Sequence, residues 1–261
     1  MYMPVIIGQN ASDEDMLYEL YSLDFLKYLM DMLNGLKSRL DVLLPQTDPI
    51  RDKKVLVFRY EIVGRFCQFA ESLGGLILRY NKLNLSSNTQ LNDNHTVNVL
   101  KTLSTYTVKE IDELYEKIQK SSLNYSILFG YDMLGNEYRN QVSLSIRTIE
   151  ESLREISGCY TFFKESYNAY KHGYRLWVGK ERNVEAAIFR NKKGSEDHIP
   201  LDDDSIELVM NSGKYCLNIF DLIKNNHKSI FDYLRKPQTK RIKMKFLLHK
   251  NTHPEEIVCK T

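Results

Sequence analysis

Apolar side chains recur every three or four residues over long stretches of this chain, which is the spacing of one face of an α-helix. The pattern covers residues 12–43 and ends at Pro45, and it returns over about 52–80 and again over about 96–120. Residues 81–95 are rich in Asn and Ser, whose side chains compete for backbone partners, so we expect an exposed loop there. The sequence therefore predicts long N-terminal helices within residues 12–83 and a third helix after the loop.

The most regular element is a predicted helix over 136–172. Its apolar residues are separated alternately by three and four positions, which predicts a seam that packs against other helices. These residues are Ile146, Ile149, Leu153, Ile156, Tyr160, Phe163, Tyr167, Tyr170 and Tyr174. At about 100° per residue, the opposite side of this helix carries Glu165, Asn168 and His172.

The pattern changes after this helix. The short apolar runs Val184–Arg190 and Asp197–Leu201 flank a glycine-containing turn, which predicts a small β-hairpin over 184–201. Asp202 to Ser205 can cap a last helix that ends before Pro237, and the basic tail, 236–261, alternates apolar and charged residues like a strand or arm. We therefore expect an all-α fold, a bundle of long helices with one small hairpin before the last helix, in a single domain spanning 1–261.

Composition agrees with a folded helical protein. Hydrophobic residues make up 43% and charged residues 27% of the chain, and the 12 Gly and 6 Pro leave few helix breakers. No basic leader and no apolar run of about 18 residues is present, so we expect no membrane association and a cytoplasmic location. The four cysteines are far apart without metal-type spacing, so we expect neither a metal nor another cofactor.

Charge is unevenly distributed, although the net charge is only +2. Residues 1–52 hold nine acidic and four basic residues, whereas residues 160–193 hold eight basic and three acidic ones, and residues 236–261 hold seven and two. This asymmetry is compatible with a polyanionic partner for the later half, or with acidic and basic faces that meet in an oligomer. The basic tail is either an aid to nucleic-acid binding or a solvated, mobile terminus.

One stretch, Ser166 to Trp177 (SYNAYKHGYRLW), concentrates polar chemistry between aromatic residues. Asn168 and His172 are one helical turn apart, and Gly173 is suited to end the helix in a left-handed conformation. Lys164, Lys171 and Arg175 add positive charge around them. The stretch is open to two interpretations: ordinary chemistry at the end of a helix, or a site in which an imidazole acts near neutral pH.

A long helix that closes with Asn168, three residues and His172 resembles the HEPN superfamily, whose helical bundles often carry the motif RNxxxH. The resemblance covers residues 96–235 at most, and this chain has Tyr167 where the motif has Arg. It implies a homodimer that cuts RNA without metal, through attack of the 2′-hydroxyl on its own phosphate. His172 and Asn168 would then be catalytic, and Lys164, Lys171 and Arg175 would bind the substrate.

The resemblance further implies a metal-independent endoribonuclease of a prokaryotic toxin or antiviral defence system, with an antitoxin or other defence protein as a possible partner. Lysine is a point charge and does not reproduce the two-pronged grip of Arg, so a protein that binds RNA without cutting it is a second hypothesis. A third is a non-catalytic helical scaffold or dimerisation protein. RNA binding predicts a steep salt dependence, whereas the scaffold predicts salt-tolerant self-association.

Overall fold

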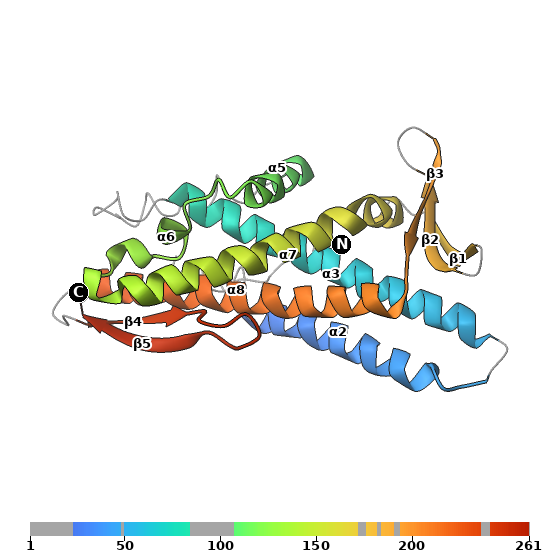
Figure 1. The fold of residues 1–261 in the computed structure, drawn as a ribbon, viewed down its shortest axis with the longest axis horizontal. Helices are drawn as coiled ribbons and strands as arrows, with labels where there is room; N and C mark the ends of the chain where they lie inside the picture. Colours follow the sequence, from blue (N-terminus) through green and yellow to red (C-terminus); the bar gives the residue numbers. More distant parts are fainter. Residues whose placement is uncertain are drawn as a thin grey trace, which may run out of the picture. The chain divides into compact units, whose positions relative to one another are not determined.

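The computed structural model describes residues 23–47, 50–83, 107–171, 176–181, 184–190, 194–235 and 241–260. Most of these residues are helical, as predicted (Figure 1). The helices are α2 (Leu23–Leu43), α3 (Arg51–Leu83), α5 (Val108–Gln119), α6 (Tyr125–Leu128), α7 (Arg139–Lys171) and α8 (Asp203–Arg235), with short 3₁₀ helices η2 (Tyr131–Met133) and η3 (Asn136–Tyr138). The predicted helix starts near Ser12 and Thr96 lie outside the described residues.

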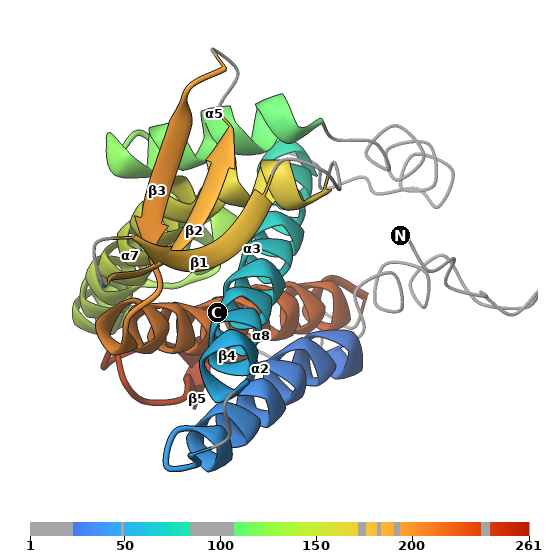
Figure 2. The ribbon, with the colours of Figure 1, turned by 90° about the vertical axis from the view of Figure 1, so that its right-hand side faces the viewer.

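Two antiparallel sheets accompany the helices. The strands are β1 (Leu176–Glu181), β2 (Val184–Arg190), β3 (Glu196–Pro200), β4 (Arg241–Phe246) and β5 (Glu255–Lys260). The predicted hairpin is confirmed as β2 and β3, and β1 adds a third strand, so that β2 lies in the middle of the sheet (Figure 2). β4 and β5 form a hairpin of their own.

The chain divides into two compact units. Unit 1 comprises Met1–Leu26, Leu73–Glu151 and Leu217–Thr261, and unit 2 comprises Lys27–Ser72 and Ser152–Cys216. The three-stranded sheet belongs to unit 2, and the β4–β5 hairpin belongs to unit 1. The predicted HEPN-like core, 96–235, contributes residues to both units.

Side chains at two helix starts satisfy backbone amides that have no partner within the helix. At α5, the backbone amide of Glu110 donates to the Thr107 hydroxyl, and the Thr107 amide donates to the Glu110 carboxylate. At α8, the carboxylate of Asp202 accepts a 2.8 Å hydrogen bond from the Ser205 amide, as the sequence predicted. Hydrogen bonds from Ser205 lower the pKa of this carboxyl below its ordinary value.

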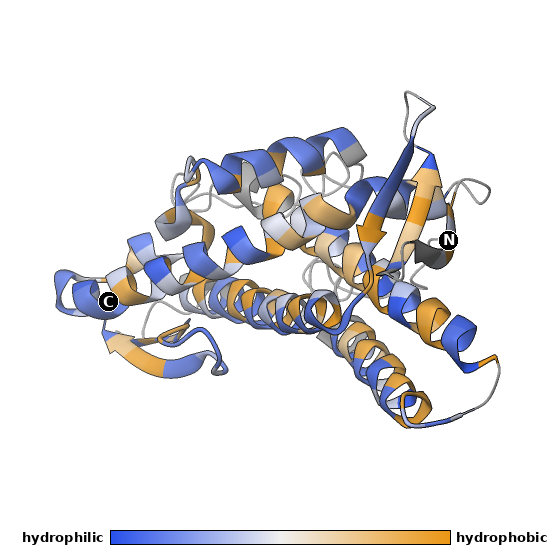
Figure 3. Ribbon diagram, turned by 45° about the vertical axis from the view of Figure 1, so that its right-hand side comes forward, coloured by the Kyte–Doolittle hydropathy of each residue, from blue (hydrophilic) through white to orange (hydrophobic). Residues whose placement is uncertain are grey.

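In unit 2, a buried arginine joins a helix to the sheet. The guanidinium of Arg59 on α3 forms ion pairs with Glu185 on β2 and with Asp203 at the start of α8, and it donates a 2.8 Å hydrogen bond to the Leu201 carbonyl. A buried guanidinium requires such partners, because burial without them would cost several kcal/mol. In Figure 3 the described helices carry both apolar and polar residues along their length, as expected of helices that have one buried and one exposed face.

In unit 1, the predicted strand of the tail is an ordered part of the core. Ile242, Met244 and Phe246 on β4 are buried, and the lysines between them are paired: Lys243 with Glu256 at 3.1 Å and Lys245 with Asp221 at 2.7 Å. The interpretation of this segment as a mobile terminus is therefore wrong for residues 241–260. Apolar and basic residues alternate along β4 because one face of the strand packs into the interior of unit 1, whereas the other face carries lysines that are paired with carboxylates.

All four cysteines, Cys67, Cys159, Cys216 and Cys259, are free and buried. Burial raises the pKa of each thiol, to about 12 for Cys159 and about 11 for Cys259. Among the described residues, no group of His, Cys, Asp and Glu is arranged to hold a metal ion. Within the same ranges, no helix has the length and apolar character of a membrane span.

Candidate functional site at the end of α7

The predicted seam of α7 is largely the buried side of the helix. Ile149, Leu153, Ile156, Tyr160, Phe163 and Tyr167 are buried, whereas Ile146 is half-buried and Tyr170 is exposed. Small residues beside the seam are buried as well, namely Ser152, Ser157, Cys159, Ser166 and Ala169. The buried stripe is thus wider than a two-position seam, as expected for a helix that is covered by more than one neighbouring element.

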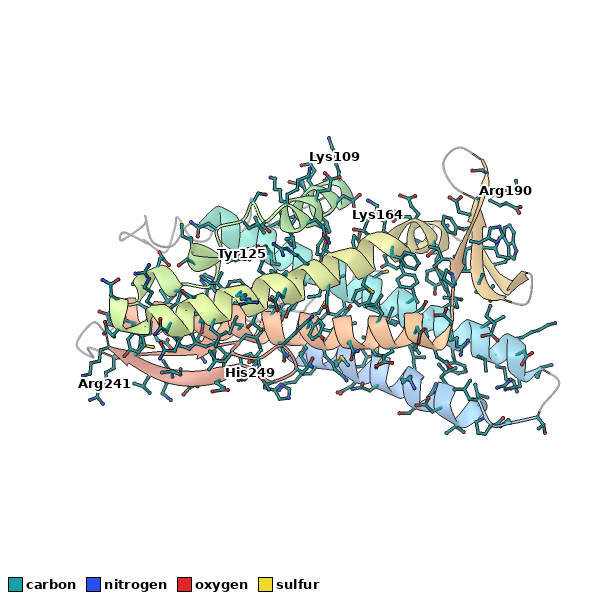
Figure 4. All side chains as sticks on the ribbon, in the orientation of Figure 1. Lys109, Tyr125, Lys164, Arg190, Arg241 and His249 are labelled. Carbon is teal, nitrogen blue, oxygen red and sulfur yellow. The ribbon has the colours of Figure 1, made fainter. Side chains whose placement is uncertain are left out.

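The polar residues that the sequence singled out on α7 lie outside the buried stripe, as far as they belong to the described residues. Asn168 and Lys164 are half-buried, and Lys164 projects outward from α7 (Figure 4). α7 ends at Lys171, so His172 directly follows the last helical residue in the sequence. His172 and Arg175, a predicted catalytic residue and a predicted substrate-binding residue, lie outside the described residues.

A single carboxylate on α3 accepts hydrogen bonds from several side chains in the last turns of α7. All of these residues belong to unit 2. Glu71 accepts hydrogen bonds from the Tyr160 hydroxyl at 3.3 Å and the Tyr167 hydroxyl at 3.5 Å, and the Lys171 ammonium lies 2.5 Å from it. We call these four residues the Glu71 cluster. The cluster fixes the C-terminal part of α7 against α3, because three donors from one helix converge on a single carboxylate.

A second carboxylate extends this contact. The hydroxyl of Tyr170 donates a 3.0 Å hydrogen bond to Glu61 on α3, and the rings of Tyr170 and Tyr60 lie 5.6 Å apart between centroids. Tilted aromatic pairs at this separation add to the packing of the two helices. The exposed Tyr170 is therefore held in place in spite of its exposure.

Tyr167 stands where the RNxxxH motif has an arginine, and it provides no positive charge. Burial, followed by the nearby charge of Glu71, raises the pKa of this phenol above its ordinary value, so the ring stays neutral. The ammonium of Lys171 lies 4.2 Å from the centroid of the Tyr167 ring, within the range of a cation–π contact. Lys171, which the sequence placed among the substrate-binding cations, is thus held by both Glu71 and Tyr167.

Sequence reasoning did not identify Glu71 or Glu61 as part of this region. Glu71 lies 100 positions before Lys171, and no local pattern near it signals the pairing. The described part of the site offers a carboxylate, phenols, an ammonium and the Asn168 amide, which is a set that can hold a helix end and bind polar groups. Comparisons with protein-family models, with curated proteins and with solved structures give no match.

Proposed function

We propose that this chain is a HEPN-like, RNA-directed protein that acts as a cytoplasmic homodimer in a prokaryotic toxin or antiviral defence system. One observation carries the proposal: Asn168 lies outside the buried stripe of α7, one turn before Lys171, the last described residue of the helix, and His172 is the next residue in the sequence. An amide and an imidazole in this order are the part of the RNxxxH pattern that the chain retains.

In this proposal the residues divide the chemistry among them. His172 accepts the proton of the 2′-hydroxyl while the 2′-oxygen bonds to phosphorus, and the bond between phosphorus and the 5′-oxygen breaks, which leaves a 2′,3′-cyclic phosphate. The same imidazole then returns the proton to the leaving 5′-oxygen, and Asn168 orients the imidazole or donates to a phosphate oxygen. A cation must balance the charge that grows on the phosphoryl oxygens. Tyr167 is neutral and supplies no such charge, so in this proposal the cation is Lys164, Lys171 or Arg175, of which Lys171 is also paired with Glu71.

Cleavage is tested with purified full-length protein and mixed cellular RNA in the presence of EDTA. The proteins are wild type, His172→Ala and Asn168→Ala, with His249→Ala as the matched control, because His249 is exposed and lies far along the chain in unit 1. The ends of the products are then identified. We expect 2′,3′-cyclic phosphate ends with wild type and the control, and a loss of about 100-fold or more in rate for His172→Ala.

The binding part of the proposal is measured separately. Wild type binds RNA with an affinity that falls steeply as salt rises, because bound cations are released from the phosphates. If no RNA is cut but this binding is present, the protein is an RNA-binding member without nuclease activity. If RNA is neither cut nor bound at low salt, the RNA-directed function is wrong.

A helical interaction protein is the second candidate, and exposed apolar residues favour it. Phe162 on α7 is 49% exposed and Leu208 on α8 is 43% exposed, both in unit 2. Light scattering after size-exclusion chromatography measures whether wild type self-associates at high salt and whether Phe162→Ser prevents it. Salt-tolerant self-association without RNA binding would support this candidate instead of the first.

A further inference from the structure

The β4–β5 hairpin has two edges, and side chains from the helices of unit 1 close the edge of β4. Asn226 on α8 accepts a hydrogen bond from the Lys245 amide and donates one to the Lys245 carbonyl. Just beyond β4, the Leu247 amide donates a 2.9 Å hydrogen bond to the hydroxyl of Ser145 on α7. In Figure 1, β4 accordingly lies between α8 and β5. The main-chain groups of Lys245 therefore point away from β5.

The register then identifies the main-chain groups on the outer edge of β5. Lys245 is opposite Glu256, and directly opposite residues of an antiparallel pair turn their main-chain groups either both toward or both away from each other. Glu256 therefore directs its amide and carbonyl away from β4, and so do Val258 and Lys260. The Lys260 amide agrees with this direction, because it donates a 2.8 Å hydrogen bond to the Tyr138 hydroxyl and not to β4.

The rest of this edge is open. Within the described residues, β5 pairs with β4 alone, and the outward amides and carbonyls of Glu256 and Val258 bond to no other element. The side chain of Val258 is 52% exposed, and Glu256 and Lys260 are exposed as well. An unpaired row of main-chain groups is a template on which another strand can pair.

The sequence of β5 is self-complementary when a second copy lies antiparallel along this edge. With Val258 opposite Val258 of the second copy, Glu256 falls opposite Lys260 of the second copy at both ends. Directly opposite residues are neighbours on one face, so each carboxylate meets an ammonium and the two exposed valines cover each other. The Lys260 amide stays with Tyr138, so the donors to the second copy are the amides of Val258 and Glu256.

The charges of the hairpin favour a second copy as the partner. Arg241 on β4 is directly opposite Lys260 on β5, and like charges in such positions destabilise a sheet. Among the described residues, neither of these two cations is in an ion pair. A second copy places the Glu256 carboxylate beside Lys260 and offsets this repulsion. Glu256 holds Lys243 at 3.1 Å through one of its oxygens, which leaves the other oxygen for Lys260 of the second copy.

We infer that two copies of this chain associate through their β5 strands and form a continuous antiparallel sheet in the order β4–β5–β5–β4, with the two-fold axis at Val258. In naming a surface for the homodimer, the inference rests on that part of the proposed function, but it requires no RNA. A contact made by one short strand is small, so we expect a weak dimer with a dissociation constant in the micromolar range.

Self-association is measured by sedimentation velocity of the full-length protein from about 1 to about 200 µM, a range that suits a weak interface. The fraction of wild type that is dimeric should rise with concentration. Glu256→Lys and Lys260→Glu each place like charges opposite each other at both ends of the contact. We expect each variant alone to weaken the dimer roughly tenfold or more.

An equimolar mixture of the two variants separates a lost contact from a damaged fold. In a dimer of one Glu256→Lys chain and one Lys260→Glu chain, both cross-strand pairs again join opposite charges. The mixture should therefore recover an affinity close to that of wild type. Glu113→Lys on α5 is the matched control, because it also removes an exposed carboxylate of unit 1 that is paired with a lysine, and it should dimerise like wild type.

Hydrogen exchange locates the contact. In wild type, residues 255–260 should exchange more slowly as the protein concentration rises, because the outward amides of Glu256 and Val258 gain partners in the second copy. The segment should show no such dependence in Glu256→Lys alone.

The outcomes distinguish this inference from the proposed function. If wild type dimerises while both variants do so equally well and residues 255–260 gain no protection, the inference is overturned and the homodimer stands on another surface. If each variant is weakened and the mixture does not recover, the antiparallel pairing is wrong. If wild type stays monomeric over the whole range, both the inference and the homodimer fail, whereas RNA cleavage and RNA binding are still decided by their own measurements.

Discussion

Lys171 on α7 and Glu71 on α3 form an ion pair with 2.5 Å between nitrogen and oxygen. The Glu71 side chain is 17% exposed, so water screens the pair less than it screens a pair on an open surface. Two tyrosine hydroxyls share the same carboxylate, which adds hydrogen bonds to the charge contact. The last turn of α7, which precedes His172, is thereby tied to another helix.

Because Lys171 and Glu71 interact directly, the effects of replacing each of them on the free energy of unfolding should not be additive. A double-mutant cycle with Glu71→Gln and Lys171→Met, measured by urea unfolding, should give an interaction free energy of about 1 kcal/mol. The exposed pair Lys37–Asp41 within α2 is the matched control and should give about 0.3–0.5 kcal/mol. Equal values for the two pairs would contradict a special role for the Glu71 cluster.

Asn226 should be among the least replaceable residues of unit 1. Its buried amide donates to the carbonyls of Phe129 at 3.1 Å and Lys245 at 3.0 Å, and it accepts from the Lys245 amide at 2.6 Å. We expect Asn226→Asp to lower the free energy of unfolding by about 3 kcal/mol or more, because both donors are lost and a buried charge faces two carbonyls.

Denaturant unfolding measures this effect, and Asn218→Ala provides the scale. Asn218 donates a single 3.0 Å hydrogen bond to the Thr252 carbonyl, so its loss should cost about 1 kcal/mol. A cost for Asn226→Asp no larger than that of Asn218→Ala would show that the three-bond network contributes little.

His227 should make the protein sensitive to acid. Burial lowers the pKa of this imidazole to about 4, while its ring nitrogen donates a 2.8 Å hydrogen bond to the Leu128 carbonyl. The unfolded chain binds the proton at about pH 6.5, so unfolding takes up a proton between these values. The free energy of unfolding should therefore fall as pH falls from about 6.5 to about 4, by at most about 3 kcal/mol from this group.

The variant His227→Gln isolates this contribution, because it retains a donor and has no titration in this range. Stability is measured by urea unfolding at a series of pH values for both proteins. As pH falls, the free energy of unfolding of wild type should decrease more steeply than that of the variant. The difference in slope corresponds to at most one proton, or about 1.4 kcal/mol per pH unit. Parallel curves would mean that His227 titrates alike in the folded and unfolded chains.

Gly130 should not tolerate a side chain. Its φ of +71° is a left-handed conformation, and an added Cβ would lie 2.1 Å from Cδ1 of the buried Ile230. We expect Gly130→Ala to cost about 1–2 kcal/mol from the backbone alone. In contrast, an added Cβ at Gly35 within α2 has no atom within 4 Å, so Gly35→Ala should stabilise by about 0.5–1 kcal/mol. Thermal unfolding compares the two variants.

Much of the fold could be predicted because its signals are local. The spacing of apolar residues identified α7 and α8, and the turn between Arg190 and Asp197 identified the hairpin. β1 was missed, because Leu176–Glu181 is short, contains Gly179 and gains its structure from pairing with β2. β5 was missed for a similar reason: its partner is β4, and its own residues show little alternation.

The site was predicted less completely, for a physical reason. Amphipathic spacing correctly put Asn168 outside the buried stripe and Tyr167 within it. It could not reveal that Lys171 is paired with Glu71, because that contact depends on how two distant helices pack. The roles of His172 and Arg175 stay predictions.

The four sheltered thiols have a practical consequence for anyone who wishes to place a probe on this molecule. Alkylating reagents attack the thiolate, and these sulfurs are both inaccessible and protonated at neutral pH. A cysteine introduced at an exposed position such as Thr161 would therefore react alone. Fluorophores or spin labels can thus be attached at a chosen point without first removing the native sulfur atoms.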